Sequence, residues 1–176
     1  MNFNKVDLSE LDVNPTVEFG KDWLLVMAGT KETGFNAMTI AWCNLGSLFD
    51  RKGQRGIPTA TIYIRPQRYT KEFIDSNDLF TLVFFPEGYK KQLAYMGAFS
   101  GKNVDKVKET GLTPAFGDGF SFFEEASKVL VCRKIYQAPM LEENFIDRTI
   151  IEDNYPKKDY HEMYIGEIIQ MLVPKK

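Results

Sequence analysis

The chain has 176 residues, of which 44% are hydrophobic and 26% charged, so we expect one globular domain with its own core. Its 22 basic and 24 acidic residues leave a net charge of −2. This argues against a nucleic-acid-binding protein, which usually carries a strong basic excess. No apolar run approaches the roughly 18 residues of a membrane span, and residues 1–10 lack the apolar segment of a signal peptide. We therefore expect neither a nucleic-acid nor a membrane partner.

The cysteine and histidine counts narrow the chemistry further. Cys43 and Cys132 lie far apart and form no CxxC pair, which favours reduced thiols and a cytoplasmic location. A single histidine, His161, excludes the zinc sites that need several cysteine and histidine ligands, so no metal site is expected. A Ser-His-Asp hydrolase would depend on His161 alone, and no GxSxG motif is present. This histidine is either a capped surface residue or a polar group facing a bound substrate.

The first half of the chain predicts a β-hairpin after a polar lead-in of residues 1–20. Trp23–Ala28 is a buried strand, and Asn36–Cys43 is a second strand whose two sides differ. One side of that second strand carries only small side chains, at Ala37, Thr39, Ala41 and Cys43. Small side chains let either a flat ligand or a closely packed helix approach the backbone, and the pattern alone leaves both open.

The rest of the chain predicts further strands with short helices between them. Thr70 is expected to be the N-cap of a helix over Lys71–Ser76, and Gly166 predicts a bulge in the last strand. The other predicted strands are Thr59–Arg65, Leu79–Phe85, Lys128–Tyr136, Tyr160–Val173 and, less clearly, Phe145–Ile151; the other predicted helices cover residues 89–97 and 103–110. These six or seven strands do not alternate with long helices. The pattern therefore favours a mainly β protein, a closed or nearly closed antiparallel barrel.

Two clusters have the composition of an anion site. Arg65, Arg68 and Thr70 surround a helix start, where free N–H groups and guanidinium groups can hold a phosphate. Ser100-Gly101-Lys102, before the next helix, offers a hydroxyl, a permissive backbone and a cation. Taken singly, a cluster of this kind is more often a solvated helix cap than a phosphate site. The second is not a P-loop, since its glycines are too close together and Asn103 replaces the required Ser or Thr.

Four stretches, taken in order, resemble the flavin reductase-like family with the FMN-binding split-barrel fold. They are Asn36–Trp42 (like N-x-M-T-x-x-W), Ile64–Thr70 (like R-P-x-R-x-T), Ser100–Lys106 (like S-G-x-x-x-D-K) and His161–Ile168 (like H-x-x-x-I-G-E-V). Their order and spacing agree with those of the family over about residues 20–173, and the branch that the chain resembles most is the flavoredoxin type. The domain is accordingly taken as residues 21–176.

The resemblance implies an FMN-binding homodimer with the flavin near the subunit interface. It implies that the isoalloxazine and ribityl chain are lined by Asn36, Ala37, Met38 and Thr39. It implies a phosphate site formed by Arg65, Pro66, Tyr69, Thr70, Ser100, Gly101 and Lys102. His161 is then expected where a nicotinamide or other partner docks, as the one candidate catalytic residue.

The function that follows is an FMN-dependent oxidoreductase that passes electrons from NAD(P)H to flavin or another acceptor. Because the flavin supplies the redox chemistry, a chain with one histidine can still be an oxidoreductase. The charged loop Phe49–Pro58 is longer than the expected linker and leaves the electron donor open. Two alternatives remain: a flavoredoxin-like electron carrier fed by another protein, with no direct nicotinamide site, and a barrel that has lost its cofactor.

Overall fold

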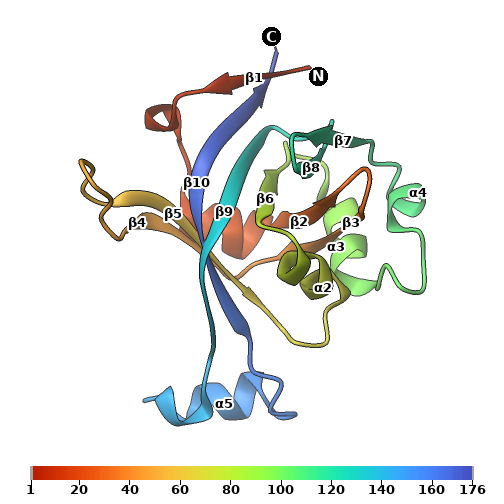
Figure 1. Ribbon diagram of the computed structural model, residues 1–176. Coiled ribbons are helices and arrows are strands. Elements are labelled where there is room, and N and C mark those ends of the chain that lie inside the picture. The colour runs from red at the N-terminus through yellow and green to blue at the C-terminus, as the bar shows by residue number, and fades with distance from the viewer. Residues whose placement is uncertain (1, 176) are drawn as a thin grey trace.

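The computed structural model describes residues 2–175 and is built mainly of antiparallel strands (Figure 1). The strands are β1 (Phe3–Val6), β2 (Leu24–Thr30), β3 (Gly34–Ile40), β4 (Cys43–Leu48), β5 (Ile57–Ile64), β6 (Leu79–Phe84), β7 (Pro114–Gly117), β8 (Phe120–Phe123), β9 (Lys128–Pro139) and β10 (Glu162–Pro174). The helices are α1 (Pro15–Val17), α2 (Tyr69–Ser76), α3 (Lys90–Ala98), α4 (Lys106–Thr110) and α5 (Thr149–Asn154), with shorter helical turns at Leu8–Glu10, Glu18–Asp22 and Glu142–Asn144.

One sheet dominates the structure and confirms the expected antiparallel, mainly β class. Its hydrogen-bonded order is β3-β2-β6-β9-β10-β5-β4, and β1 pairs with β10 beside this path. The path contains seven strands, and β1 adds an eighth to this sheet, whereas the sequence predicted six or seven strands. Residues 1–20 are thus more than a lead-in, because β1 joins the main sheet. Strands β7 and β8 form a separate hairpin in a segment where the sequence predicted no strand.

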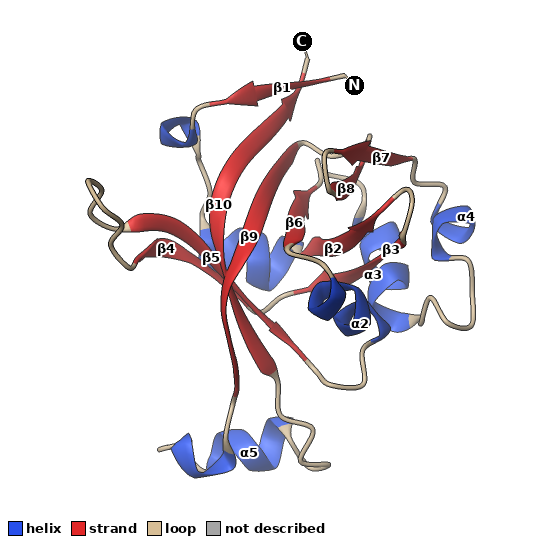
Figure 2. Cartoon of the chain, viewed as in Figure 1, coloured by secondary structure: helices blue, strands red, loops and turns tan. Residues whose placement is uncertain are grey.

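Both faces of the sheet are covered, which explains the continuous apolar run in β2. Leu24, Val26 and Ala28 face one hydrophobic core, whereas Leu25 and Met27 face a second core on the other side. The first core also takes Ile74 of α2, and the second takes Leu93 and Met96 of α3. Figure 2 shows α2 and α3 beside β2 and β3, where the two predicted hairpin strands pair. These two helices therefore frame the edge strand β3.

Gly166 lies at the predicted bulge in β10. The register between β9 and β10 shifts between Ile165 and Gly166. A Cβ on Gly166 would lie 2.7 Å from ring carbons of Phe80 and 2.9 Å from the Cβ of Cys132. Glycine is needed here because the neighbouring strands leave no space for a side chain.

Several predicted elements need correction. The segment Phe145–Ile151 is not a strand: it leads into α5, and the Phe145 ring packs on Tyr155 and Tyr160 at centroid distances of 5.6 and 5.8 Å. Cys43 does not end β3 but begins β4. The helix predicted from residue 103 begins only at Lys106, because the carboxylate of Asp105 accepts the Lys108 N–H as its N-cap.

The N-cap prediction for Thr70 is also wrong. Helix α2 begins at Tyr69, and Arg68 occupies the N-cap position without a side-chain capping bond. Thr70 lies inside the first turn, is 1% exposed, and uses its hydroxyl to accept a hydrogen bond from Asn36 Nδ2 at 2.8 Å. The hydroxyl therefore serves a contact between α2 and β3, and the start of α2 lacks a side-chain cap.

Candidate functional site

The small-residue side of β3 packs against α3 at Ala37 and Thr39. The Thr39 hydroxyl donates a hydrogen bond to the Leu93 carbonyl of α3, and a Cβ on Gly97 would come within 3.2 Å of the Thr39 Cβ. The Ala37 carbonyl accepts a hydrogen bond from the Lys106 ammonium. Of the two alternatives left open by the sequence, the closely packed helix is the correct one for this part of the strand.

Two cavities meet at Met38, which belongs to the other side of β3. The first, which we name the anion cavity, has a volume of about 90 Å³ and is lined by Asn36, Met38, Gln67, Arg68, Tyr69, Thr70, Ala98, Phe99, Ser100, Gly101 and Lys106. The second, which we name the histidine cavity, has a volume of about 270 Å³ and is lined by Met38, Thr39, Ile40, Ala41, Trp42, Tyr63, Arg65 and His161. Because Met38 lines both, the two cavities lie next to each other along β3.

The anion cavity brings together three of the four motif stretches, one of which includes the start of α2. Asn36 and Thr70 are joined by their hydrogen bond, and Gly101 approaches Asn36 so closely that a Cβ there would collide with the amide oxygen. The N-terminal end of α2 has no side-chain cap, so its first N–H groups and its dipole favour a negative charge. Tyr69 and Ser100 complete the wall as the sequence predicted.

Two cations line this cavity without a carboxylate partner among residues 2–175. The Arg68 guanidinium donates to the Gly97 carbonyl at 2.5 Å, and the Lys106 ammonium donates to the carbonyls of Ala37 and Met96. Lys106 is only 5% exposed. Burial, and then the Arg68 charge, lower the pKa of Lys106 to about 8; burial and then Arg65 lower the pKa of Arg68. A buried ammonium and a partly buried guanidinium facing one small space form a place for an anion.

Some predicted phosphate ligands lie elsewhere. Lys102 points away from the anion cavity, forms an ion pair with Glu72 at 2.5 Å and lies 4.9 Å above the Tyr69 ring. Arg65 lines the histidine cavity rather than the anion cavity, and Pro66 lines neither of them. Within the described residues, the cations that face the anion cavity are therefore Arg68 and Lys106.

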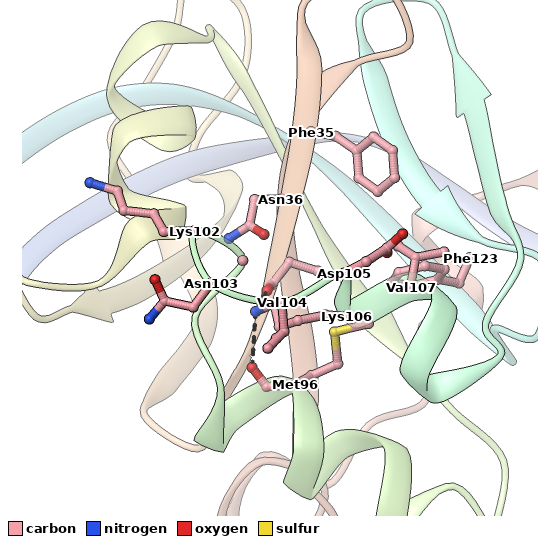
Figure 3. A pocket seen from close by; sticks show the side chains of 12 residues that line it. Phe35, Asn36, Met96, Lys102, Asn103, Val104, Asp105, Lys106, Val107 and Phe123 are labelled. Atoms are coloured by element: carbon pink, nitrogen blue, oxygen red, sulfur yellow. Dashed lines mark hydrogen bonds between the residues drawn. The ribbon is translucent and has the colours of Figure 1, made fainter.

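A third cavity, drawn in Figure 3, adjoins the anion cavity. It has a volume of about 490 Å³ and shares Asn36, Gly101 and Lys106 with the anion cavity. Its remaining wall is formed by Phe35, Ala37, Met96, Lys102, Asn103, Val104, Asp105, Val107 and Phe123. Figure 3 shows the hydrogen bond that the Lys106 ammonium donates to the Met96 carbonyl.

His161 stands in the histidine cavity, just before β10. Its ring stacks on Trp42 at a centroid distance of 4.6 Å and an angle of 32°, and its Nδ1 lies 2.7 Å from the Tyr155 hydroxyl. Burial, and then the nearby Arg65 charge, lower the pKa of His161 to about 4. The ring is therefore neutral at physiological pH.

Arg65 is held beside His161 by the segment that follows α5. Its guanidinium forms an ion pair with Asp159 at 2.7 Å, donates to the Asn154 carbonyl at 2.8 Å and lies 5.0 Å from the centre of the Tyr155 ring. These contacts fix the guanidinium toward α5 and away from the anion cavity. Figure 1 shows α5 at the far end of the arm formed by β9 and β10.

The sequence missed part of this site. Arg68 was named in the helix-start cluster that could hold a phosphate but was not among the phosphate residues that the family resemblance implied, and Lys106 was seen only as the last residue of the S-G-x-x-x-D-K stretch. Tyr155 and Asp159 carried no signal, because nothing in the chain pattern shows that they face Arg65 and His161. Among the described residues, no group of three or more His, Cys, Asp or Glu side chains is placed to hold a metal ion. No helix in the same part of the chain is long and apolar enough to cross a membrane.

Comparisons with known proteins agree with this fold. A flavoredoxin from Methanosarcina acetivorans superposes with a TM-score of 0.61 at 22% identity over 85% of this chain and 66% of that chain, so our chain spans about two thirds of its length. An FMN-binding domain of a flavin reductase-like enzyme from Shewanella baltica OS155 superposes with a TM-score of 0.64 at 18% identity, over 98% of this chain and 78% of that chain.

A flavin reductase with a split-barrel domain from Shewanella frigidimarina, described as putative, gives a TM-score of 0.62 at 20% identity, covering 86% of this chain and 66% of that one. These likenesses show the split-barrel fold. No functionally curated protein sequence matches the chain. The family model described as "Flavin reductase like domain" matches residues 18–176, nearly the whole sequence. The chain therefore belongs to the flavin reductase-like family.

Proposed function

We propose that this protein binds FMN along β3, with the terminal phosphate in the anion cavity and the ring system reaching past Met38 into the histidine cavity. In this role it is an oxidoreductase that passes electrons from NAD(P)H to flavin or another acceptor. Family membership supports a flavin cofactor, and the Shewanella baltica domain of the same fold is described as FMN-binding. The observation that carries the proposal is a pair of cations, the buried Lys106 and the partly buried Arg68, lining a cavity at an uncapped helix start.

The chemistry of the lining residues fits this cofactor. A phosphate accepts hydrogen bonds only, and the anion cavity offers guanidinium, ammonium and hydroxyl donors and lacks Asp and Glu side chains. The histidine cavity offers Met38, Ile40 and the face of Trp42, which suit a flat aromatic ring system. A ribityl chain between the two would pass Met38, the residue common to both.

Each part of the site has its own task. Bound flavin would supply the hydride and electron transfer, as this cofactor does in other enzymes. Arg68 and Lys106 hold the phosphate and so fix the position of the cofactor along β3. Trp42 and Met38 keep water from the ring. His161 provides a neutral imidazole on the side where a nicotinamide or another electron donor would approach.

The expected homodimer and cytoplasmic location also remain proposals. Trp42 is 41% exposed beside the histidine cavity, although its ring stacks on buried His161. A second copy covering this edge would shield the tryptophan and complete the wall of the cavity. Size-exclusion chromatography with light scattering tests this: a single monomeric species with FMN bound would rule out the dimer.

The first experiment is the visible absorption spectrum of the purified protein with FMN, before and after anaerobic addition of NADH or NADPH. Flavin bands that shift on binding and bleach with the nicotinamide support the oxidoreductase. Bands that shift but persist would indicate an electron carrier reduced by another protein. A spectrum equal to that of free FMN, with no flavin retained on gel filtration, would overturn the cofactor assignment.

A further inference from the structure

A buried tyrosine outside the family-like stretches contacts the one histidine of the site. Tyr155 follows α5, is 1% exposed, and places its hydroxyl 2.7 Å from His161 Nδ1. We propose that Tyr155 is a positioning residue that fixes the His161 ring as the tautomer protonated at Nε2, so that the ring presents a neutral hydrogen-bond donor to the histidine cavity. The role of that donor rests on the proposed function; the tautomer itself does not.

The direction of the hydrogen bond follows from the protonation of both groups. Burial raises the pKa of Tyr155, so the phenol keeps its proton, while His161 is neutral and has one nitrogen with a free lone pair. If the phenol donates to Nδ1, the proton of the neutral ring must be on Nε2. In the reverse arrangement, a protonated Nδ1 would donate to the phenol oxygen, and the phenol would have to donate its own proton elsewhere. The acceptor would be Met140 Sδ, which lies 4.0 Å away and accepts only weakly.

Tyr155 is itself held in place from several sides. The Arg65 guanidinium lies 5.0 Å from its ring centre and is anchored by Asp159, and the Trp42 ring meets it edge-on at 6.4 Å. The charged groups near His161 are thus Arg65, which disfavours the imidazolium, and Asp159, which favours it less strongly. Tyr63 is the other titratable group lining the cavity. These contacts leave the imidazole little freedom to turn or to exchange tautomers.

The consequence concerns which ligand His161 can recognise. Nδ1 is occupied by Tyr155, and within residues 2–175 Nε2 has no hydrogen-bond partner. A neutral N–H recognises an uncharged acceptor, such as the carbonyl oxygen of a carboxamide or of a flavin ring. His161 would then orient a carbonyl-bearing electron donor and would not deliver a proton as a general acid.

The test is a long-range proton–nitrogen correlation spectrum of nitrogen-15-labelled, flavin-free protein. Because the chain has one histidine, its ring signals need no assignment. We expect the pattern of the Nε2–H tautomer, unchanged between about pH 5 and pH 8, the range in which an ordinary histidine titrates. Tyr155→Phe should give a mixture of tautomers and move the titration upward, because the phenol hydrogen bond favours the neutral ring.

Tyr160→Phe is the matched control. Tyr160 packs on Tyr155 at 4.8 Å, but its hydroxyl binds Glu142 at 2.7 Å, so its removal should leave the His161 tautomer unchanged. In the flavin-loaded protein, reduction by NADH should be independent of pH from about 5.5 to 8 and become pH-dependent in Tyr155→Phe.

An Nδ1–H tautomer in the wild type, or an unchanged tautomer in a folded Tyr155→Phe variant, would overturn the inference. If that variant does not fold, the wild-type spectrum alone decides. Failure to bind FMN would instead refute the proposed function and leave the tautomer result valid.

Discussion

Raising the pH from 7 to 9 should weaken FMN binding about tenfold through one residue, Lys106. Its pKa in the flavin-free protein is about 8, because the ammonium is buried beside Arg68. About nine-tenths of the protein therefore carries the Lys106 charge at pH 7 and about one-tenth at pH 9. If the phosphate binds only the charged form, the apparent affinity falls in proportion, which corresponds to about 1.4 kcal/mol.

The assay compares FMN with riboflavin, which lacks the phosphate. Flavin fluorescence at pH 7, 8 and 9 gives both affinities under the same conditions, and the phosphate keeps its full charge above its second pKa of about 6. We expect FMN affinity to fall and riboflavin affinity to stay constant. Lys106→Arg, whose guanidinium does not titrate in this range, should remove the pH dependence. The reasoning is refuted if FMN and riboflavin weaken equally, or if FMN affinity does not change.

Two further substitutions test the packing around the site. Gly166→Val should destabilise the fold by about 1–3 kcal/mol, because its side chain would collide with Phe80; urea unfolding measures this, and Gly46→Ala, in open space, should stay within about 0.5 kcal/mol. Equal midpoints for these two variants would mean that the bulge relaxes freely. Thr70→Val should cost about 1–3 kcal/mol by leaving the buried Asn36 amide without its acceptor, and Thr70→Ser should retain most of the stability. A Thr70→Val variant as stable as wild type would show that the amide finds another partner.

The sequence predicts best the strands in which either both faces are buried or one face is buried and the other is partly exposed. Strand β2 is apolar throughout because both of its faces are covered, and β5 alternates because it is half-buried. The segment Phe145–Ile151 was wrongly predicted as a strand, because Phe145 packs locally on Tyr155 and Tyr160 instead of entering a sheet. Strands β7 and β8 were missed because a four-residue strand is too short to show a period.

The site was predictable where the contacts are local or lie in the family-like stretches. Thr70, Ser100 and Gly101, which were assigned to the phosphate, line the anion cavity together with Asn36, which was assigned to the flavin ring and ribityl chain. Arg65 could not be placed, because its position depends on Asp159, a residue 94 positions away in the chain. The role of Lys106 was hidden for a similar reason, since the carbonyls that bind it belong to β3 and to α3.

Strand β10 has a consequence for folding during synthesis. It pairs with β9 over most of its length, with β5 through Glu162–Glu167 and with β1 through Met171–Pro174. All three partners precede it in the chain, so the ribosome releases them before the strand that joins them exists. Until β10 emerges, their hydrogen-bonding edges stay open to other chains, as the edges of any unpaired strand do. The nascent protein is therefore prone to misassociation until β10 is made, and a pause in translation before β10 would prolong that exposure.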